Sequence, residues 1–342
     1  MRIAMISTPY LQTPPTKYGG TERVVSMLTE EFVRIGHDVT LFASEGSKTT
    51  ANLIEIWNDK QGVMKNIDFI RLLYKNIMKS GEFDIIHNNH NIVVDISTKK
   101  DIIPIITTMH NPIDNYNLKL SNKSDYICIS KNQEFYAKKT GFNVLKSIYN
   151  PTDTDLYPYF PNQGTNLIFL GSISRVKGAH LAIDVAEKTG KKLLIAGPIF
   201  DDEYYQLKIK TRLNNNIEYI GEINDSDKIK LFSNALALLF PVQWEEPFGL
   251  VMTEAMACGI PVIGFNKGSI PEVVKDGETG FVVKDVIEMI TAIDKIDLID
   301  RNLCRKRIEE YFSVDRITKE YENLYNEIIY NSTRKIGELN DK

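Results

Sequence analysis

Residues 241–280 read PVQWEEPFGLVMTEAMACGIPVIGFNKGSIPEVVKDGETG and carry the clearest structural pattern in the chain. An apolar run at 235–242 predicts a buried strand, and a Phe248-Gly249 turn then leads into an apolar helix. A strand, a glycine turn and a helix in this order are typical of an α/β unit in a parallel sheet. Ligands of such sheets bind where the strands end, so this stretch is the first place to look for a site.

Two carboxylates border the predicted beginning of this helix. Glu246 lies on the loop before the helix, and Glu254 follows eight residues later, about a turn and a half inside it. A helix N-terminus carries unpaired N–H groups and about half a positive charge, which suits a diphosphate. Carboxylates suit hydroxyl groups, so the pattern favours a phosphorylated sugar as the ligand.

The composition is that of an ordinary globular protein. The chain has 342 residues, 43% hydrophobic and 25% charged, which is enough for two domains of about 150 residues each. A net charge of −4 gives no electrostatic case for nucleic acid. A small excess of basic residues in 1–150 is compatible with weak peripheral contact with an anionic membrane, although a solvated surface explains it better.

Signals for targeting, disulfides and metals are missing from the sequence. The start MRIAMISTPY has an apolar run that is too short for a signal peptide. No apolar run in the sequence approaches the length of a membrane span, so we expect a cytoplasmic protein. The three cysteines are scattered without a CxxC pair. Asp153-Thr154-Asp155 matches the DxD pattern of some metal–diphosphate sites, but it lies in a proline-rich hinge, and we interpret the match as accidental.

The first half predicts a parallel α/β domain. Strand-like and helix-like segments alternate from residue 2 to residue 130, beginning with a strand at 2–7 and a helix at 21–35. The loop between these two ends in Gly19-Gly20, which is either a plain tight turn or a close backbone approach to a ligand. His110 falls just past a strand end and is a candidate site residue, whereas His87 ends an apolar strand and predicts a buried hydrogen bond.

The second half repeats the pattern after a proline-rich linker at 149–164. The predicted strands of this second sheet are 166–170, 193–196, 217–220, 235–240 and 261–264. Arg175 and Lys177 lie in the loop that opens a helix at 179–189, where fixed cations can neutralise a diphosphate. A last helix from residue 316 has an apolar stripe and must pack on something.

The segment EEPFGLVMTEAMACGIPVIGFNKGSIPEVVKDGETGFVV closely resembles the signature of glycosyltransferase family 4, retaining enzymes of the GT-B fold. YGGTERVV near the start, TMH, FLGSISRVKGAHLAI and the C-terminal helix resemble the family as well, so the likeness covers nearly the whole chain. It implies two Rossmann-like domains facing across a cleft, with residues 1–155 binding the acceptor and residues 156–310 binding the nucleotide-sugar donor. Residues 311–342 would form a helix that packs back on the first domain, and a tail.

The resemblance implies which residues bind the donor diphosphate. Gly19 and Gly20 match the family's N-terminal glycine loop, and Lys177 matches its diphosphate lysine. Backbone N–H groups would add to these contacts from Phe248, Gly249 and Leu250.

The resemblance also implies the groups that hold the sugar and the nucleoside. Glu246 and Glu254 fall on the two acids of the family's E-x7-E motif, the first facing the transferred sugar and the second holding the ribose hydroxyls. His110 matches the histidine near the 6-position of the sugar. Ile223 lies where family members contact the base through the backbone.

One residue departs from the family pattern. The family usually has an arginine directly after the glycine of GRLxxxKG, and Ser172 stands there in this chain. Arg175, three residues further on, can supply the missing charge from the same loop. If it does not, the lost contact of about 1.5–3 kcal/mol lowers binding or rate about tenfold to a hundredfold.

By the resemblance, we expect a metal-independent retaining hexosyltransferase that uses a nucleotide diphosphate sugar as co-substrate, most commonly a UDP-sugar with GDP and ADP behind. Its acceptor is a hydroxyl of unknown identity in polysaccharide, glycolipid or small-molecule glycoside synthesis. A non-catalytic nucleotide-sugar binding protein and a GT-B nucleotide-sugar 2-epimerase remain alternatives. An NAD-dependent oxidoreductase is disfavoured because neither half has GxGxxG followed by an acid about 20 residues later.

Overall fold

A computed structural model describes residues 1–57, 72–73, 75–77, 79–90, 103–113 and 125–340, the last seven of these for the backbone alone. The chain forms two compact units, each built on its own sheet. The first consists of Met1–Pro15, Gly19–Pro151 and Val314–Lys342, and the second of Thr16–Tyr18 and Thr152–Ser313. Two parallel sheets in one chain confirm the α/β fold class predicted from the sequence.

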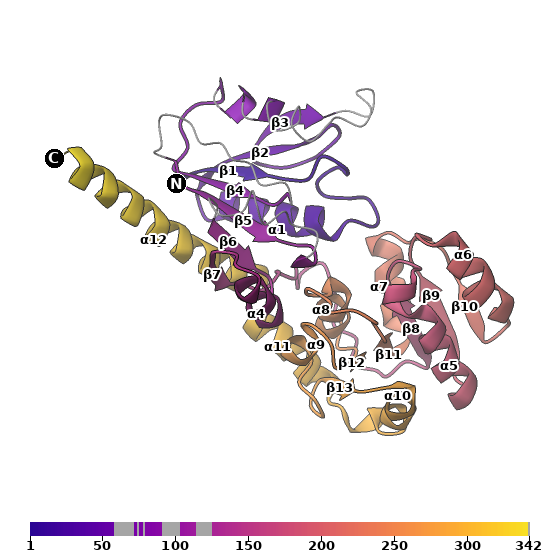
Figure 1. The fold of residues 1–342 in the computed structure, drawn as a ribbon. Coiled ribbons are helices and arrows are strands. Elements are labelled where there is room, and N and C mark those ends of the chain that lie inside the picture. Colours follow the sequence, from indigo (N-terminus) through magenta and orange to yellow (C-terminus); the bar gives the residue numbers. More distant parts are fainter. Residues whose placement is uncertain (58–71, 74, 78, 91–102, 114–124, 341–342) are drawn as a thin grey trace. The chain divides into compact units, whose positions relative to one another are not determined.

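The first unit is a parallel sheet with the strand order β3-β2-β1-β4-β5-β6-β7 (Figure 1). Its strands are β1 (Arg2–Ile6), β2 (Asp38–Ser44), β3 (Asn52–Trp57), β4 (Ile85–Asn88), β5 (Ile105–Met109), β6 (Asp125–Cys128) and β7 (Val144–Ser147). The chain winds outward from β1 in one direction and then restarts at β4 in the other. This reversal is the switch point at which open α/β sheets bind ligands.

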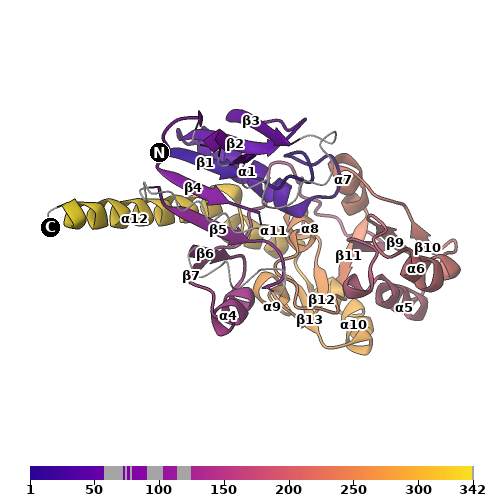
Figure 2. The same cartoon turned by 45° about the horizontal axis from the view of Figure 1, so that its top comes forward.

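The labelled helices of the first unit are α1 (Gly20–Arg34), α4 (Lys131–Lys139) and α12 (Val314–Asn340), and the described residues 72–73, 75–77 and 79 are helical as well. The long helix α12 lies beside the sheet in both views of the fold (Figure 1, Figure 2). The ring of Tyr325 on α12 stacks on Phe32 of α1, with the ring centroids 5.3 Å apart. The Tyr325 hydroxyl also lies 2.6 Å from Nδ1 of the buried His87. The apolar stripe of the C-terminal helix thus packs on the first unit, as predicted.

The second unit is a parallel sheet with the order β10-β9-β8-β11-β12-β13. Its strands are β8 (Asn166–Leu170), β9 (Leu193–Ala196), β10 (Ile217–Tyr219), β11 (Ala235–Phe240), β12 (Val262–Phe265) and β13 (Gly280–Val283). Its α-helices are α5 (Ala179–Thr189), α6 (Asp202–Tyr204), α7 (Asp225–Ser233), α8 (Leu250–Ala257), α9 (Ile270–Val273), α10 (Val286–Ile293) and α11 (Arg301–Tyr311). Shorter turns of 3₁₀ or π helix are η3 (Arg175–Lys177), η4 (Tyr205–Ile209), η5 (Lys210–Arg212) and η6 (Ile296–Leu298).

The core of the second unit lies around β11, the strand that precedes the acidic loop. Every residue of β11 is buried, as expected of a central strand covered on both faces. The switch point falls between β11 and β8, its neighbour in the sheet. The loops that follow these two strands carry Lys177 and Glu246, so the topology brings together two residues that lie 69 positions apart.

Among the helices that the structure describes, none is both long enough and apolar enough to cross a membrane.

Candidate active site

The loops after β8 and β11 are joined by their backbones at the switch point of the second unit. The N–H of Gln243 donates to the carbonyl of Val176 over 2.7 Å. Gly178 ends the first loop with φ 76°, and a Cβ there would lie 2.2 Å from the carbonyl oxygen of Pro241. Only glycine allows this close approach, so the residue type at 178 fixes how far apart the two loops lie.

Lys177 and Glu246 form an ion pair where these loops meet. Lys177 Nζ lies 2.6 Å from Glu246 Oε2, and the side chains are only 16% and 8% exposed. Trp244 Nε1 donates to the same carboxylate oxygen over 2.7 Å. The lysine ammonium also lies over two aromatic rings, 4.9 Å from the centroid of Trp244 and 5.9 Å from that of Phe240. This largely desolvated cation is held in one position, as anion binding requires.

The helix α8 begins four residues after Glu246. Its N-cap is Gly249, which has φ 78° and no side chain to cap the first N–H groups. Leu250 is the first helical residue, and the buried Phe248 accepts a hydrogen bond from Ser269 Oγ through its carbonyl oxygen, at 2.7 Å. The structure therefore confirms a helix beginning after the Phe248-Gly249 turn, and its dipole adds positive potential next to Lys177.

The loop that carries Glu246 is fixed by the segment after β12. Ser269 N donates to the Glu246 carbonyl oxygen over 3.0 Å, and Gly268 N donates to Glu245 Oε2 over 2.7 Å. A Cβ at Gly268 would lie 2.2 Å from the same Glu246 carbonyl. The position of the Glu246 carboxylate is thus set by backbone contacts on one side and by Lys177 and Trp244 on the other.

Glu254 belongs to a second cluster, on the buried face of α8. Its Oε1 accepts a hydrogen bond from Lys228 Nζ at 2.9 Å and from the Tyr157 hydroxyl at 2.8 Å. The lysine and glutamate side chains are 10% and 7% exposed. The two acids of the motif are therefore held alike, each by one lysine and one aromatic donor.

Arg175 is drawn toward a different set of carboxylates. Its Nε lies 3.3 Å from Asp201 Oδ2 and its Nη2 lies 3.5 Å from Glu203 Oε2, with 57% of the side chain exposed. The guanidinium also lies over the ring of Tyr204, 5.7 Å from its centroid. Exposed ion pairs of this kind are weak, so a phosphate can replace the carboxylates at small cost.

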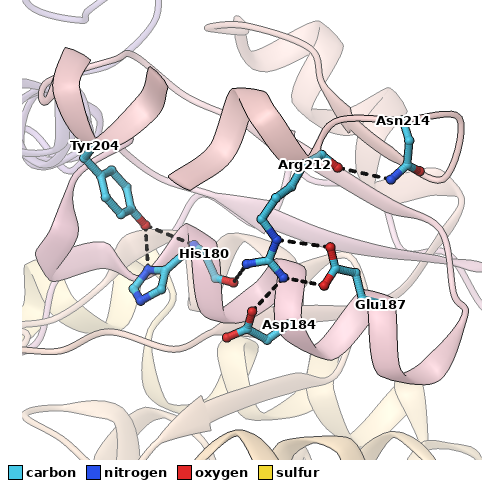
Figure 3. Close-up of polar contacts among 6 residues, drawn as sticks. All are labelled: His180, Asp184, Glu187, Tyr204, Arg212 and Asn214. Atoms are coloured by element: carbon cyan, nitrogen blue, oxygen red, sulfur yellow. Dashed lines mark hydrogen bonds and ion pairs between the residues drawn. The ribbon is translucent and has the colours of Figure 1, made fainter. Parts of the chain in front are cut away.

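Tyr204 is held by the network shown in Figure 3. Its hydroxyl accepts a hydrogen bond from His180 N over 2.9 Å and lies 2.8 Å from His180 Nδ1. Arg212 bridges Asp184 at 2.7 Å and Glu187 at 2.5 Å on α5, and its Nη1 donates to the carbonyl of His180. Burial raises the pKa of Tyr204 and lowers that of His180, so both stay neutral near pH 7. The network fixes the ring against which Arg175 rests.

Ile223 is the remaining predicted site residue of the second unit, whereas Ser172 and Asp153 were not assigned to the site from the sequence. Ile223 precedes α7, whose N-cap Asn224 accepts a hydrogen bond from the backbone N–H of Asp227. Ser172 is 3% exposed and lies 3.5 Å from the hydroxyl of Ser174. Asp153 Oδ1 accepts hydrogen bonds from the backbone N–H groups of Asp155 and Leu156, as an ordinary turn aspartate does.

Gly19, Gly20 and His110 belong to the first unit. Gly19 is the N-cap of α1 with φ 149°, and a Cβ there would lie 2.7 Å from the Cβ of Pro15, so the close turn requires glycine. Gly20 begins α1 and is exposed.

His110 follows β5 and is half-buried, with Nε2 2.9 Å from Asn89 Oδ1. Burial lowers its pKa to about 3, so its imidazole is neutral near pH 7. It can accept or donate a hydrogen bond but carries no charge.

Three residues of the site were missed from the sequence: Trp244, Lys228 and Tyr157. Lys228 had a readable signal, because it shares a helical face with Leu231 and Phe232, and all three are buried. A lysine on an apolar stripe indicates a buried partner. Trp244 and Tyr157 lie in loops without periodicity, so no pattern could have assigned them.

A doubly wound sheet with a largely desolvated cation at its switch point and a helix N-terminus in the following loop is typical of proteins that bind phosphorylated ligands. The model for glycosyl transferases group 1 matches residues 159–311, and that for glycosyltransferase family 4 matches residues 18–156. The chain therefore belongs to the family 4, group 1 glycosyltransferases and is a glycosyltransferase of the GT-B fold.

Several distant relatives match nearly the whole chain. Spore coat protein SA of Bacillus subtilis is 23% identical over 91% of this chain and 93% of its own length. The crystal structure of AviGT4, a glycosyltransferase involved in avilamycin A biosynthesis, has a TM-score of 0.78 at 22% identity, covering 96% of this chain and 98% of that one. HepE of Anabaena, in complex with UDP and glucose, has a TM-score of 0.78 at 18% identity, covering 95% and 99%. These structural likenesses establish the fold.

Proposed function

We propose that this enzyme transfers a hexose-type sugar from a UDP-sugar to a hydroxyl of its acceptor, with retention at the anomeric carbon and without a metal ion. The bond between the anomeric carbon and the diphosphate oxygen breaks, and the bond to the acceptor oxygen forms on the same face. The departing phosphate takes the acceptor's proton. The product belongs to cell-surface polysaccharide, glycolipid or small-molecule glycoside synthesis.

The observation that carries this proposal is the ion pair of Lys177 with Glu246, which lies four residues before the first residue of α8. Negative charge builds on the leaving diphosphate, so the main catalytic requirement is positive charge that is already in place. Lys177 is desolvated and clamped between Glu246 and the aromatic rings, so little reorganisation is needed. Backbone N–H groups from Phe248, Gly249 and Leu250 complete the proposed diphosphate site.

The two acids take different parts of the donor in this proposal. Glu246, held at the diphosphate end by Lys177, binds hydroxyls of the transferred sugar and tunes the local charge, and it is not a nucleophile. Glu254 binds the ribose hydroxyls, and the backbone at Ile223 contacts the base. This arrangement uses each carboxylate as a hydrogen-bond acceptor, which suits its ionised form.

Three residues of the first unit also have roles in this proposal. We assign Gly19 and Gly20 to the diphosphate and His110 to the 6-position of the sugar. Because its imidazole is neutral, His110 acts as a hydrogen-bonding group and not as a general acid. Arg175 supplies the charge that Ser172 lacks, by releasing its exposed carboxylate partners.

The structural likeness to HepE supports UDP as the nucleotide, since HepE has been crystallised with UDP and glucose and with UDP-glucose. A thermal-shift screen of UDP, GDP, ADP and their sugars tests the choice. A nucleotide at 100 times its dissociation constant adds about 2.7 kcal/mol of stability. Stabilisation by GDP or ADP but not by UDP would change the assigned donor.

The role of Lys177 is tested by Lys177→Ala, with Lys188→Ala as the control. Lys188 is exposed on the last turn of α5, in the same unit, and its removal should change nothing. We expect Lys177→Ala to lower turnover at least a hundredfold while the protein stays folded, as for loss of a preorganised charge. Near-normal turnover would contradict the assignment.

Two further measurements separate this reaction from its alternatives. Activity should survive EDTA, and loss of activity that a divalent ion restores would refute the metal-free mechanism. Incubation with a nucleotide sugar alone should yield no epimer. Tight donor binding without transfer or hydrolysis would indicate a binding protein instead.

A further inference from the structure

We propose that Lys228 and Tyr157 are positioning residues that orient Glu254 toward the ribose of the donor nucleotide. The inference rests on the proposed function, in which Glu254 holds the ribose hydroxyls, and it adds two residues that the family motif does not contain. Neither residue touches the donor in this view. Both act by fixing the carboxylate that does.

The contacts converge on one oxygen of one carboxylate. Lys228 Nζ lies 2.9 Å and the Tyr157 hydroxyl 2.8 Å from Glu254 Oε1. The two donors are also bound to each other, with Lys228 Nζ donating to the Tyr157 hydroxyl over 3.1 Å. Two donors on the same oxygen fix the rotation of the carboxylate group, and they thereby fix the direction in which Oε2 lies.

The cluster is buried, so it cannot be an incidental surface pair. Over the whole residue, side chain and backbone together, Glu254 is 5% exposed, Lys228 8% and Tyr157 2%. The lysine ammonium also lies 5.5 Å from the centroid of the Tyr157 ring, and its other carboxylate contact is Asp225 Oδ1 at 3.2 Å. Burying an ion pair costs desolvation that the attraction between the charges seldom exceeds, and apolar residues would serve packing alone as well. A buried carboxylate with a fixed direction is instead what hydroxyl recognition requires.

The helix that carries Lys228 also links the two nucleoside contacts. Ile223, proposed to contact the base, directly precedes the N-cap of α7. Lys228 lies one turn further on, on the buried face of the same helix. A rigid helix therefore connects the base loop to the acid that faces the ribose. By binding Glu254, Lys228 sets the distance between the base loop and the carboxylate that faces the ribose.

The test compares UDP with 2′-deoxy-UDP and 3′-deoxy-UDP by calorimetry. In the wild type, loss of a hydroxyl that Glu254 binds should weaken binding about tenfold to a hundredfold, as for hydrogen bonds to charged groups. The quantity compared is the ratio of the dissociation constant of the deoxy nucleotide to that of UDP. We expect Lys228→Met to bring this ratio close to one, and Tyr157→Phe, which removes only one hydroxyl, to lower it severalfold. Lys228→Arg, which keeps a donor, should restore part of the ratio.

The matched control is Lys230→Met, which removes a lysine from the same helix. Lys230 also pairs with an aspartate three residues away, at 2.9 Å from Asp227 Oδ1, but its side chain is 75% exposed. It should leave the ratio at the wild-type value. A purely structural role for Lys228 predicts something different, namely that UDP and both deoxy analogues weaken by the same factor.

The outcomes separate this inference from the proposed function. If Glu254→Gln loses the discrimination while Lys228→Met and Tyr157→Phe keep it, the positioning role is refuted and the ribose assignment stands. If the wild type shows no loss that depends on the hydroxyl, or if Glu254→Gln keeps the wild-type discrimination, the ribose assignment fails, and the inference fails with it. Should Lys228→Met not fold, Tyr157→Phe decides alone. GDP and ADP with their deoxy forms replace UDP if the screen selects them.

Discussion

Replacing Gly178 by alanine should damage the site far more than it damages the fold. Gly178 is the N-cap of α5 and ends the loop that carries Lys177, with φ 76°. Gly190 is the C-cap of the same helix, with φ 67°. An L-residue in this left-handed conformation costs about 1–2 kcal/mol at either position. A Cβ at Gly190 meets nothing within 4 Å, so Gly190→Ala should cost that strain and nothing more.

At Gly178 the new Cβ adds a clash with the opposite loop. It would lie 2.2 Å from the Pro241 carbonyl oxygen, whereas carbon and oxygen normally approach no closer than about 3.3 Å. The two loops must therefore separate by about 1 Å, next to a Lys177–Glu246 pair that is only 2.6 Å long. A misplacement of about 1 Å can lower a rate about a hundredfold. We expect that loss in kcat/KM for Gly178→Ala and less than a threefold change for Gly190→Ala.

The assay measures donor hydrolysis or transfer together with urea unfolding of both variants. Hydrolysis needs only the nucleotide sugar that the thermal-shift screen selects, so the acceptor does not have to be known. The urea unfolding of each variant gives its loss of stability. A loss of activity in Gly178→Ala that exceeds the loss in an equally destabilised Gly190→Ala is then due to displacement of the loops and not to general destabilisation. Equal activity of Gly178→Ala and Gly190→Ala would show that the spacing of the two loops does not control the site.

Burial lowers the pKa of His87 from 6.5 to about 3. Between these pH values the unfolded chain binds more protons than the folded chain, so the free energy of unfolding decreases as the pH falls below 6.5. The loss should reach about 2 kcal/mol at pH 5, and chemical unfolding of wild type and His87→Gln should show a steeper decline for the wild type; parallel curves would contradict it. Arg175→Met should leave unfolding within about 0.5 kcal/mol, because its ion pairs are exposed, yet weaken donor binding about tenfold or more by calorimetry. Unchanged binding would remove Arg175 from the site.

The sequence predicted the central strands and helices best. Strands at 166–170, 193–196 and 235–240 and the helix at 179–189 have the predicted bounds. These segments are apolar runs closed by glycine or polar loops, and burial on both faces leaves little room for another pattern.

Edge and short strands were missed for a physical reason. β3, β7 and β13 had no counterpart among the predicted strands, although all three complete the sheets. In β7 the residues Leu145 and Lys146 are exposed, so the strand shows no apolar face to read. An edge strand is recruited by the neighbouring strand through backbone hydrogen bonds, which the side-chain pattern does not record. Within residues 311–342, where a helix and a tail were predicted, the helix α12 continues as far as Asn340.

In the site, too, the sequence predicted the features that depend on local structure. The sequence alone predicted that one acid precedes a helix beginning after Gly249 and that a second acid, eight residues later, lies inside it, because glycine turns and helical periodicity are local. It also predicted that Lys177 lies in a loop at the ligand-binding edge. The predicted buried hydrogen bond of His87 is present, with its Nε2 2.7 Å from Thr108 Oγ1.

Only the tertiary structure decided which cation faces which acid. Lys177 meets Glu246 across 69 residues and Lys228 meets Glu254 across 26, while Arg175 turns to Asp201. These pairings depend on the order in which β8, β9 and β11 lie side by side and on the glycine that lets two loops touch. A sequence pattern fixes where a charge lies along its own element, and the packing of distant elements fixes which charge it meets.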